Sequence, residues 1–190
     1  FNQSIVIGDK ILGIGLDKYL GKDYEGYKRL GFDNYKIQRM YKEQVLSDVI
    51  YAFIESEFPN NFTEDNLISE MLYQGRIMYM LDALLPEETD SLKWNFSNKQ
   101  LKWLEQSERD MWDYLIDQKI LFNSDYMLKK RFTGEGPFTS EFGKESPAKA
   151  AVWIGYRIIK SYQKTNETSI PELMKISDSQ KILNKAKYNP

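Results

Sequence analysis

The sequence predicts an α+β fold that is mainly helical, with strands confined to a short N-terminal β-hairpin. Two β-rich runs flank Gly8-Asp9-Lys10 near the start of the chain, whereas most of the rest follows helical spacing. Apolar residues make up 42% of the 190 residues, an ordinary fraction for a globular protein, and no repeat, linker or low-complexity tract divides them. We therefore expect a single domain over residues 1–190. Because the chain begins with Phe1 rather than Met, we expect it to be a piece of a longer product.

The two N-terminal runs, residues 4–7 and 11–16, predict a hairpin with a glycine-containing turn. A hairpin by itself is only marginally stable in water, so we expect helices or further strands to pack on it. We expect those further strands to lie in a preceding part of the protein, which leaves the sheet incomplete here. A short apolar turn over residues 16–21 and a tyrosine-rich loop over residues 24–32 follow.

Two helices are predicted next, over residues 35–58 and 64–85. The first has apolar residues at intervals of three and four and is ended by Pro59. The second has Thr63 as its expected N-cap, Glu64 and Asp65 in its first turn, and Pro86 after its end. Its apolar residues cover more than one face, so it should lie at the centre of the domain.

The C-terminal half is predicted to be helical, with one glycine-containing loop. Ser97 should cap a helix over residues 98–117, and Ser146 followed by Pro147 should begin a long helix that runs to residue 164. Shorter helical segments are expected over residues 120–130 and after residue 170. The loop over residues 132–138 lacks the Gly-Lys-Ser/Thr ending of a phosphate-binding loop.

The chain contains no histidine and no cysteine, which excludes most common catalytic chemistry. Without histidine there is no near-neutral general base and no imidazole ligand for zinc, and without cysteine there is no thiolate nucleophile and no disulfide. The net charge of −2 gives no overall attraction for nucleic acid, and the short basic stretch over residues 129–131 is typical of a solvated surface. No apolar run approaches the roughly 20 residues that a membrane span needs.

Residues 67–73 have the frame of the zinc-peptidase motif HExxH, but both histidines are replaced. Ser69 and Tyr73 stand where the metal ligands would be, and Glu70 stands where the general base would be. A working site needs two histidines one helical turn apart on one helix face. Serine and tyrosine are poor zinc ligands at neutral pH, so we interpret Ser69, Glu70 and Tyr73 as vestigial and expect no metal and no cofactor. If any ion binds, oxygen ligands favour calcium or magnesium.

Several segments together resemble the gliding-motility lipoprotein GldB family of Bacteroidetes. They are Val6-Ile7-Gly8-Asp9, residues 16–21, residues 75–86, Glu145-Ser146-Pro147 before residues 153–157, residues 180–183, and the final Lys187-Tyr188-Asn189-Pro190. The resemblance implies a cell-envelope lipoprotein that faces the periplasm or the cell surface and has no assigned enzymatic chemistry. It implies contacts with other envelope or gliding-machinery proteins, and membrane attachment through an N-terminal lipid anchor outside this chain. The family is in turn similar to predicted HExxH zinc peptidases, which implies a zincin-like helical core.

Three functions are compatible with these observations. The preferred one is a non-catalytic envelope module that acts through protein–protein contacts. The first alternative is a carboxylate-based or metal-assisted hydrolase that uses Glu70, with Glu145 or Asp82 as a second carboxylate. The second is a module that binds a peptide or glycan in the vestigial groove. The candidate binding residues are Tyr73, Glu145, Trp153 and Tyr156, with Ser69 also in the groove.

Each candidate also has a structural explanation. Glu145 precedes a predicted helix N-terminus, where the helix dipole stabilises negative charge. Gly155 lies within a predicted helix, where glycine costs roughly 1 kcal/mol relative to alanine, which indicates close helix packing. An aromatic group could form a recognition surface or simply cover the core: Tyr19, Tyr24, Tyr27, Phe32 and Tyr35.

Overall fold

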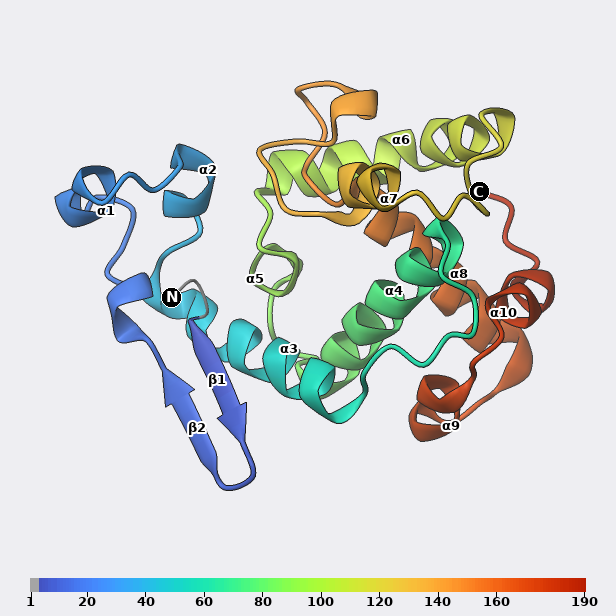
Figure 1. Ribbon diagram of the computed structural model, residues 1–190, viewed down its shortest axis with the longest axis horizontal. Helices are drawn as coiled ribbons and strands as arrows, with labels where there is room; N and C mark the ends of the chain where they lie inside the picture. The colour runs from blue at the N-terminus through green and yellow to red at the C-terminus, as the bar shows by residue number, and fades with distance from the viewer. Residues whose placement is uncertain (1–3) are drawn as a thin grey trace.

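The computed structural model describes residues 4–190 and is mainly helical, with one two-stranded antiparallel sheet, as the sequence predicts (Figure 1). Residues 1–3 of the expected domain lie outside the described part of the chain. The helices are α1 (Glu25–Arg29), α2 (Asn34–Ile37), α3 (Val45–Glu57), α4 (Leu67–Leu84), α5 (Asp90–Trp94), α6 (Asn98–Asp117), α7 (Tyr126–Thr133), α8 (Ala150–Asn166), α9 (Ile170–Lys175) and α10 (Ser179–Ala186). Residues 4–190 also contain three short 3-10 helices, η1 (Leu16–Lys18), η2 (Lys42–Gln44) and η3 (Ser140–Phe142).

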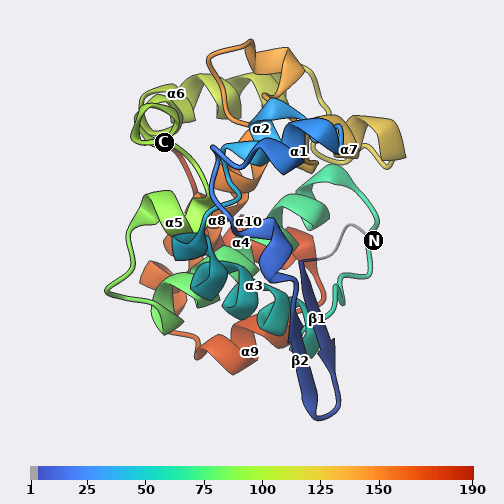
Figure 2. The same cartoon turned by 90° about the vertical axis from the view of Figure 1, so that its left-hand side faces the viewer.

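The predicted hairpin is confirmed. Strand β1 (Ile5–Gly8) pairs with β2 (Ile11–Ile14) in a register that sets Ile5 opposite Ile14 and Gly8 opposite Ile11. Strand β1 also contacts α3, which supplies the helix packing that the hairpin needs. Beyond this contact the hairpin projects away from the other helices (Figure 2).

Residues 4–41 form an N-terminal arm beside the helical body (Figure 1). The arm has its own small hydrophobic cluster of Tyr27, Ile37 and Met40, with Phe32 packed against it. The Tyr27 hydroxyl accepts a hydrogen bond from the Leu20 amide and donates one to a backbone carbonyl. Part of the aromatic group is therefore structural, while Tyr24 is exposed at the surface.

The single helix expected over residues 35–58 is wrong, because the structure divides it into α2, η2 and α3. Tyr41 adopts an extended backbone and forms an isolated antiparallel bridge with Leu20, which interrupts the helix. Met40, just before the break, is buried in the cluster of the arm. The apolar residues keep helical spacing across this break because α2 and α3 each bury one face.

Helix α4 lies at the centre of the body, as its many-sided apolar pattern predicts, and α8 packs along it (Figure 1). Its core side chains are fully buried: Leu67, Ile68, Met71, Leu72, Ile77 and Leu81. The expected start of this helix is wrong. Asn66, rather than Thr63, is the N-cap. Thr63 lies outside the helix, where its amide and its hydroxyl both donate hydrogen bonds to the Ser177 carbonyl, at 2.9 and 3.1 Å respectively.

Helix α6 matches its predicted range of residues 98–117, whereas α7 and α8 begin and end later than predicted. Ser97 caps α6 in a reciprocal capping box, as expected. Ser146 does not cap α8; its hydroxyl lies in the preceding loop, 3.1 Å from the Thr139 amide and 2.7 Å from the Gly143 carbonyl. The helix begins at Ala150, and Lys149 before it adopts a left-handed backbone with φ 58°. Helix α7 begins several residues later than expected, where Asp125 caps it.

Candidate functional site

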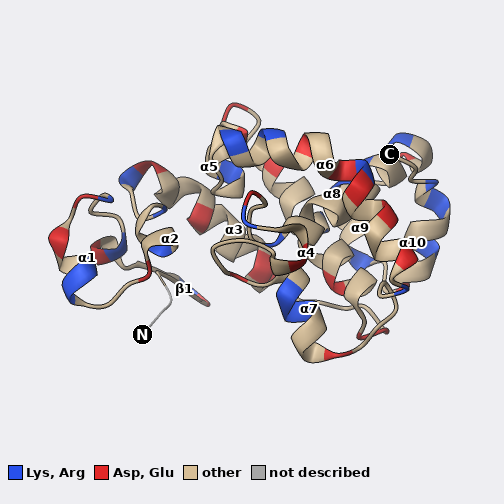
Figure 3. Ribbon diagram, turned by 90° about the horizontal axis from the view of Figure 1, so that it is seen from above, with Lys and Arg blue, Asp and Glu red and all other residues tan. Residues whose placement is uncertain are grey.

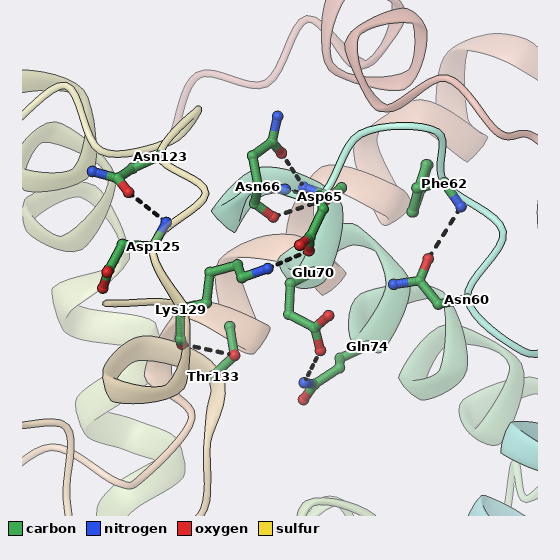
Figure 4. A network of polar contacts seen from close by, with 11 residues as sticks. Asn60, Phe62, Asp65, Asn66, Glu70, Gln74, Asn123, Asp125, Lys129 and Thr133 are labelled. Carbon is green, nitrogen blue, oxygen red and sulfur yellow. Dashed lines mark hydrogen bonds and ion pairs between the residues drawn. The ribbon is translucent and has the colours of Figure 1, made fainter. Parts of the chain in front are cut away.

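Ser69 and Glu70 lie in the first turn of α4, and each side chain has a partner within the helix. Asn66 Oδ1 accepts a hydrogen bond from the Ser69 amide at 3.0 Å, and Ser69 Oγ accepts one from the Asn66 amide at 3.1 Å. Glu70 is half-buried and accepts a hydrogen bond from Gln74 Nε2 at 2.6 Å (Figure 4). The ion pair of Lys129 with Asp65 lies next to Glu70 in the same view. Ser69 therefore acts as a capping residue, and only Glu70 faces a surface hollow.

Tyr73 is half-buried one helical turn after Ser69. Burial raises the pKa of Tyr73 to about 12, and the negative charges of Glu55 and Glu70 add to this effect. The phenol therefore stays protonated at neutral pH, where it can donate a hydrogen bond but is a weak base.

Trp153 and Tyr156 are buried on α8 in an aromatic cluster with Trp94, at ring-centroid distances of 5.3 and 5.2 Å from it. The polar ends of both side chains have partners inside the protein. Trp153 Nε1 donates to Glu108 at 3.4 Å, and the Tyr156 hydroxyl donates to Asp82. These contacts hold the helices together and leave neither polar group directed at solvent.

Glu145 lies at the surface, away from the hollow beside Glu70. It forms an exposed ion pair with Lys99 at 2.7 Å, and this hydrogen bond and charge lower the pKa of Glu145. Asp82 forms an ion pair with Lys93 and accepts a hydrogen bond from the Tyr156 hydroxyl. The structure thus does not bring Glu70, Asp82 and Glu145 together, and no group of three acidic side chains in residues 4–190 could hold a metal ion.

A polar cleft that the sequence did not predict lies between the arm, α3 and the start of α8. It consists of three adjoining cavities of about 180, 350 and 580 Å³, each lined by both Asp48 and Glu135. We call it the Asp48–Glu135 cleft. Asp48 comes from α3, Glu135 from the glycine-containing loop after α7, and Lys149 from the residue before α8.

Asp48 is held by two hydrogen bonds within the cleft. Its Oδ2 accepts from the Tyr19 hydroxyl at 2.8 Å, and its Oδ1 accepts from Gln44 Nε2 at 3.1 Å. Burial raises the pKa of Asp48, and the two hydrogen bonds offset part of that rise. Asp48 is therefore a carboxylate whose charged form is disfavoured by its surroundings.

Glu135 forms ion pairs that connect the arm to the start of α8. It accepts from Arg39 Nη1 at 2.9 Å and from Lys149 Nζ. Desolvation by the surrounding protein raises the pKa of Glu135, whose side chain is 54% exposed, but the two cations outweigh this and leave the pKa lowered. The cleft thus contains two carboxylates whose environments shift their pKa values in opposite directions.

Helix α4 borders this cleft with Gln74 and Met78, whereas Ser69, Glu70 and Tyr73 do not line it. Gln74, the partner of Glu70, lines two of its three cavities, and burial raises the pKa of the adjoining Tyr51 well above its ordinary range. A sequence signal for the cleft exists on α3. Residues with polar groups recur at three- and four-residue intervals from the residue before α3 onwards, beside its buried face: Gln44, Asp48, Tyr51 and Glu55.

In residues 4–190 no helix is long and apolar enough to cross a bilayer. Basic and acidic residues are interspersed along the ribbon rather than separated by sign (Figure 3).

A family model described as gliding motility protein GldB matches residues 1–190. No curated protein and no solved structure matches the chain.

Proposed function

The chain belongs to the gliding motility protein GldB family, and on this premise we propose that it is a non-catalytic module of the cell envelope. The module acts through contacts with other proteins of the gliding machinery. It is held at the membrane by a lipid anchor that precedes the chain, and it faces the periplasm or the cell surface.

The observation that carries this proposal is the exposed apolar surface of the N-terminal arm. Val6, Ile11 and Leu30 are 58%, 75% and 73% exposed. Further apolar side chains of the arm are at least half exposed: Leu12, Leu16 and Leu20. Single exposed apolar residues are common, whereas a group of them on one projecting segment is typical of a protein interaction site.

The non-catalytic character is supported by the roles of the HExxH-like residues. Ser69 exchanges hydrogen bonds with Asn66 in the N-terminal cap of α4, and the raised pKa of Tyr73 keeps its phenol protonated. Glu70 is thus left without a second catalytic group from this motif. The zincin-like relation of the helical core stays a prediction.

The proposal can be tested by site-specific photo-crosslinking in cells that carry the full-length protein. A photoreactive residue at Ile11 or Leu30 should crosslink to the same envelope protein, and Ile11→Lys with Leu30→Lys should reduce both this crosslink and gliding. Phe122 is a matched control because it is 54% exposed and lies outside the arm. If the arm variants glide normally and give no crosslink, the arm is not the contact surface and the proposal is wrong.

A carboxylate-based hydrolase is the second candidate, favoured by the opposite pKa shifts of Asp48 and Glu135 in one cleft. Paired carboxyl groups with separated pKa values can act as general acid and general base. The purified protein should be tested against peptide and glycoside substrates, with and without a chelator. An activity that disappears in Asp48→Asn or Glu70→Gln would replace the non-catalytic proposal.

A further inference from the structure

The outer edge of the β-hairpin is formed by β2, and no strand of residues 4–190 pairs with it. The sheet contains only β1 and β2, and α3 packs against β1. Strand β2 lies on the side of the hairpin that faces away from α3 (Figure 1). An unpaired strand edge presents a row of free backbone N–H and C=O groups, with which another extended chain can pair.

The register of the hairpin identifies the backbone groups of β2 that point outwards. The Gly15 amide donates to the Ser4 carbonyl at 2.7 Å, and in an antiparallel pair such bonded positions recur at every second residue. Gly13 therefore bonds to β1, whereas Leu12 and Ile14 direct their N–H and C=O groups to the outer edge. A second extended backbone carries N–H and C=O groups at the same spacing and can satisfy all of them.

Apart from its short length, β2 has none of the features that commonly protect an exposed strand edge. Its sequence, Ile11-Leu12-Gly13-Ile14, contains no charged residue and no proline, and its register with β1 contains no bulge. Apolar side chains are exposed on both faces of β2, since Leu12 and Ile14 share one face and Ile11 lies on the other. A segment with apolar side chains on both of its faces therefore fits beside β2.

The exposed apolar surface continues from β2 along the outer side of the arm. Leu16 in η1, Leu20 and Leu30 are each more than half exposed. The 3-10 helix η1 follows β2 directly, and α1 lies beyond it at the outer end of the arm (Figure 1). Because β2 has only four residues, a bound segment that continues past η1 gains apolar contacts that pairing with β2 alone does not supply.

A segment of a partner protein fits this edge better than the two other sources of a strand. Two copies of the chain joined through β2 would share only two four-residue strands, whereas a stable interface needs about 800 Å² on each partner. A preceding strand of the same protein, if antiparallel to β2, would run parallel to β1 and need a crossover connection of about a dozen residues or more. A partner segment needs no such connection and can extend along the whole outer side of the arm.

We propose that an extended apolar segment of a partner protein pairs with the outer edge of β2 and becomes the third strand of this sheet. Its backbone exchanges hydrogen bonds with Leu12 and Ile14, and its side chains cover the exposed apolar residues on both faces of β2. It then continues over η1 towards α1. This inference rests on the proposed function, which makes the arm the contact surface, and adds the way in which the partner is bound.

The test compares Leu12→Pro with Leu12→Val in cells that carry the full-length protein with a photoreactive residue at Leu30. Proline removes the outward N–H of residue 12, leaves the groups that join β1 and β2 in place, and is tolerated on edge strands. Valine has an apolar side chain of similar size and keeps the N–H. Crosslinking to the partner should fall about fivefold in Leu12→Pro, the usual effect of losing one backbone hydrogen bond, and stay near the natural level in Leu12→Val.

Hydrogen exchange of single amides gives a second measurement that does not depend on proline. In the free full-length protein the Leu12 and Ile14 amides should exchange rapidly, and the Gly13 amide slowly because it bonds to β1. In the purified crosslinked complex, exchange at Leu12 and Ile14 should slow by on the order of tenfold or more. Slow exchange at Gly13 in Leu12→Pro shows that the hairpin of this variant is folded; if it is not, exchange in the natural complex decides the question.

Each contrary outcome has a different meaning. Equal crosslinking in the two variants, or rapid exchange at Leu12 and Ile14 in the complex, would mean that the arm binds its partner through side chains alone; the proposed function would stand and this inference would fall. A crosslink between two copies of the chain would replace the partner segment with a second copy. Slow exchange of both amides in the free protein would assign the third strand to the preceding part of the protein. No crosslink at Leu30 in the natural protein would overturn the proposed function and this inference together.

Discussion

Gly75 on α4 and Gly155 on α8 face each other where the two helices cross, and neither position has room for a side chain. A Cβ atom on Gly75 would lie 2.5 Å from the backbone carbon of Gly155, and one on Gly155 would lie 2.0 Å from the Met71 carbonyl oxygen. Since both contacts are with backbone, the two helices would have to move apart. This confirms the prediction that Gly155 marks close helix packing.

The first prediction is that Gly155→Ala lowers the free energy of unfolding by about 3 kcal/mol, at the upper end of the usual cost of overpacking. Urea denaturation followed by circular dichroism would measure it. Gly8→Ala is the matched control, because a Cβ on Gly8 meets nothing within 4 Å, and it should change stability by less than about 0.5 kcal/mol. Equal effects of the two substitutions would show that the crossing tolerates a side chain.

The central pair of helices could be predicted because its signals are local. The apolar pattern of α4 and the glycine within α8 each identify a buried helix from a few neighbouring residues. The cleft could not be predicted in the same way. Arg39, Asp48, Glu135 and Lys149 come from four distant segments, and only the tertiary fold brings them together.

Helix starts were predicted less well than helix positions, and the reason is chemical. Thr63 and Asn66 are both good N-cap residues, so the sequence alone does not decide between them. The choice is made by a contact distant in sequence, since the Ser177 carbonyl binds Thr63 and holds the backbone before α4 out of the helix. The Ser146 hydroxyl is instead held within its own loop, where it accepts a hydrogen bond from the Thr139 amide seven residues earlier.

The second prediction concerns this cap. Asn66→Ala should lower the free energy of unfolding by about 1 kcal/mol, because the Ser69 amide loses its acceptor. Thr63→Ala is the control and should cost less, since it removes one exposed hydrogen bond to Ser177. Amide hydrogen exchange at Ser69 should accelerate in Asn66→Ala alone. A larger cost for Thr63→Ala than for Asn66→Ala would contradict the prediction that the Asn66 side chain stabilises the start of α4.

The third prediction concerns Arg76, which is buried in α4 without a carboxylate partner in the described residues. Its Nη2 donates to Asn61 at 3.0 Å, and its guanidinium lies 4.1 Å from the centre of the Phe62 ring. Its Nη1 donates to three backbone carbonyls at the end of α9, those of Leu173, Met174 and Ile176. The Arg76 side chain therefore connects the end of α9 to α4 through hydrogen bonds.

Arg76→Met should lower the free energy of unfolding by about 3 kcal/mol, because it leaves several buried carbonyl groups without donors. Arg76→Lys should rescue little of this, since an ammonium group does not reproduce the planar fork of a guanidinium. Arg109→Met, at an exposed ion pair on α6, is the control and should cost less than about 1 kcal/mol. Hydrogen exchange that stays slow in α9 of Arg76→Met would contradict the assigned role.

The fourth prediction uses the opposite pKa shifts of Asp48 and Glu135. Because the pKa of Glu135 is lowered in the folded state, its stabilising contribution is present at neutral pH and is lost as the pH falls through that lowered value. Because the pKa of Asp48 is raised, its charged form opposes folding. Its cost is absent below the ordinary aspartate pKa of about 4 and grows as the pH rises through the raised value.

The two neutral variants should therefore differ from the natural protein with opposite pH slopes. Between pH 3 and pH 7, roughly the range in which carboxyl groups titrate, the stability of Glu135→Gln relative to the natural protein should fall as the pH rises. That of Asp48→Asn should rise over the same range, whatever its value at low pH. Urea denaturation at a series of pH values gives both slopes. If both slopes have the same sign, the two carboxyl groups do not experience the opposed environments that Tyr19, Arg39 and Lys149 provide here.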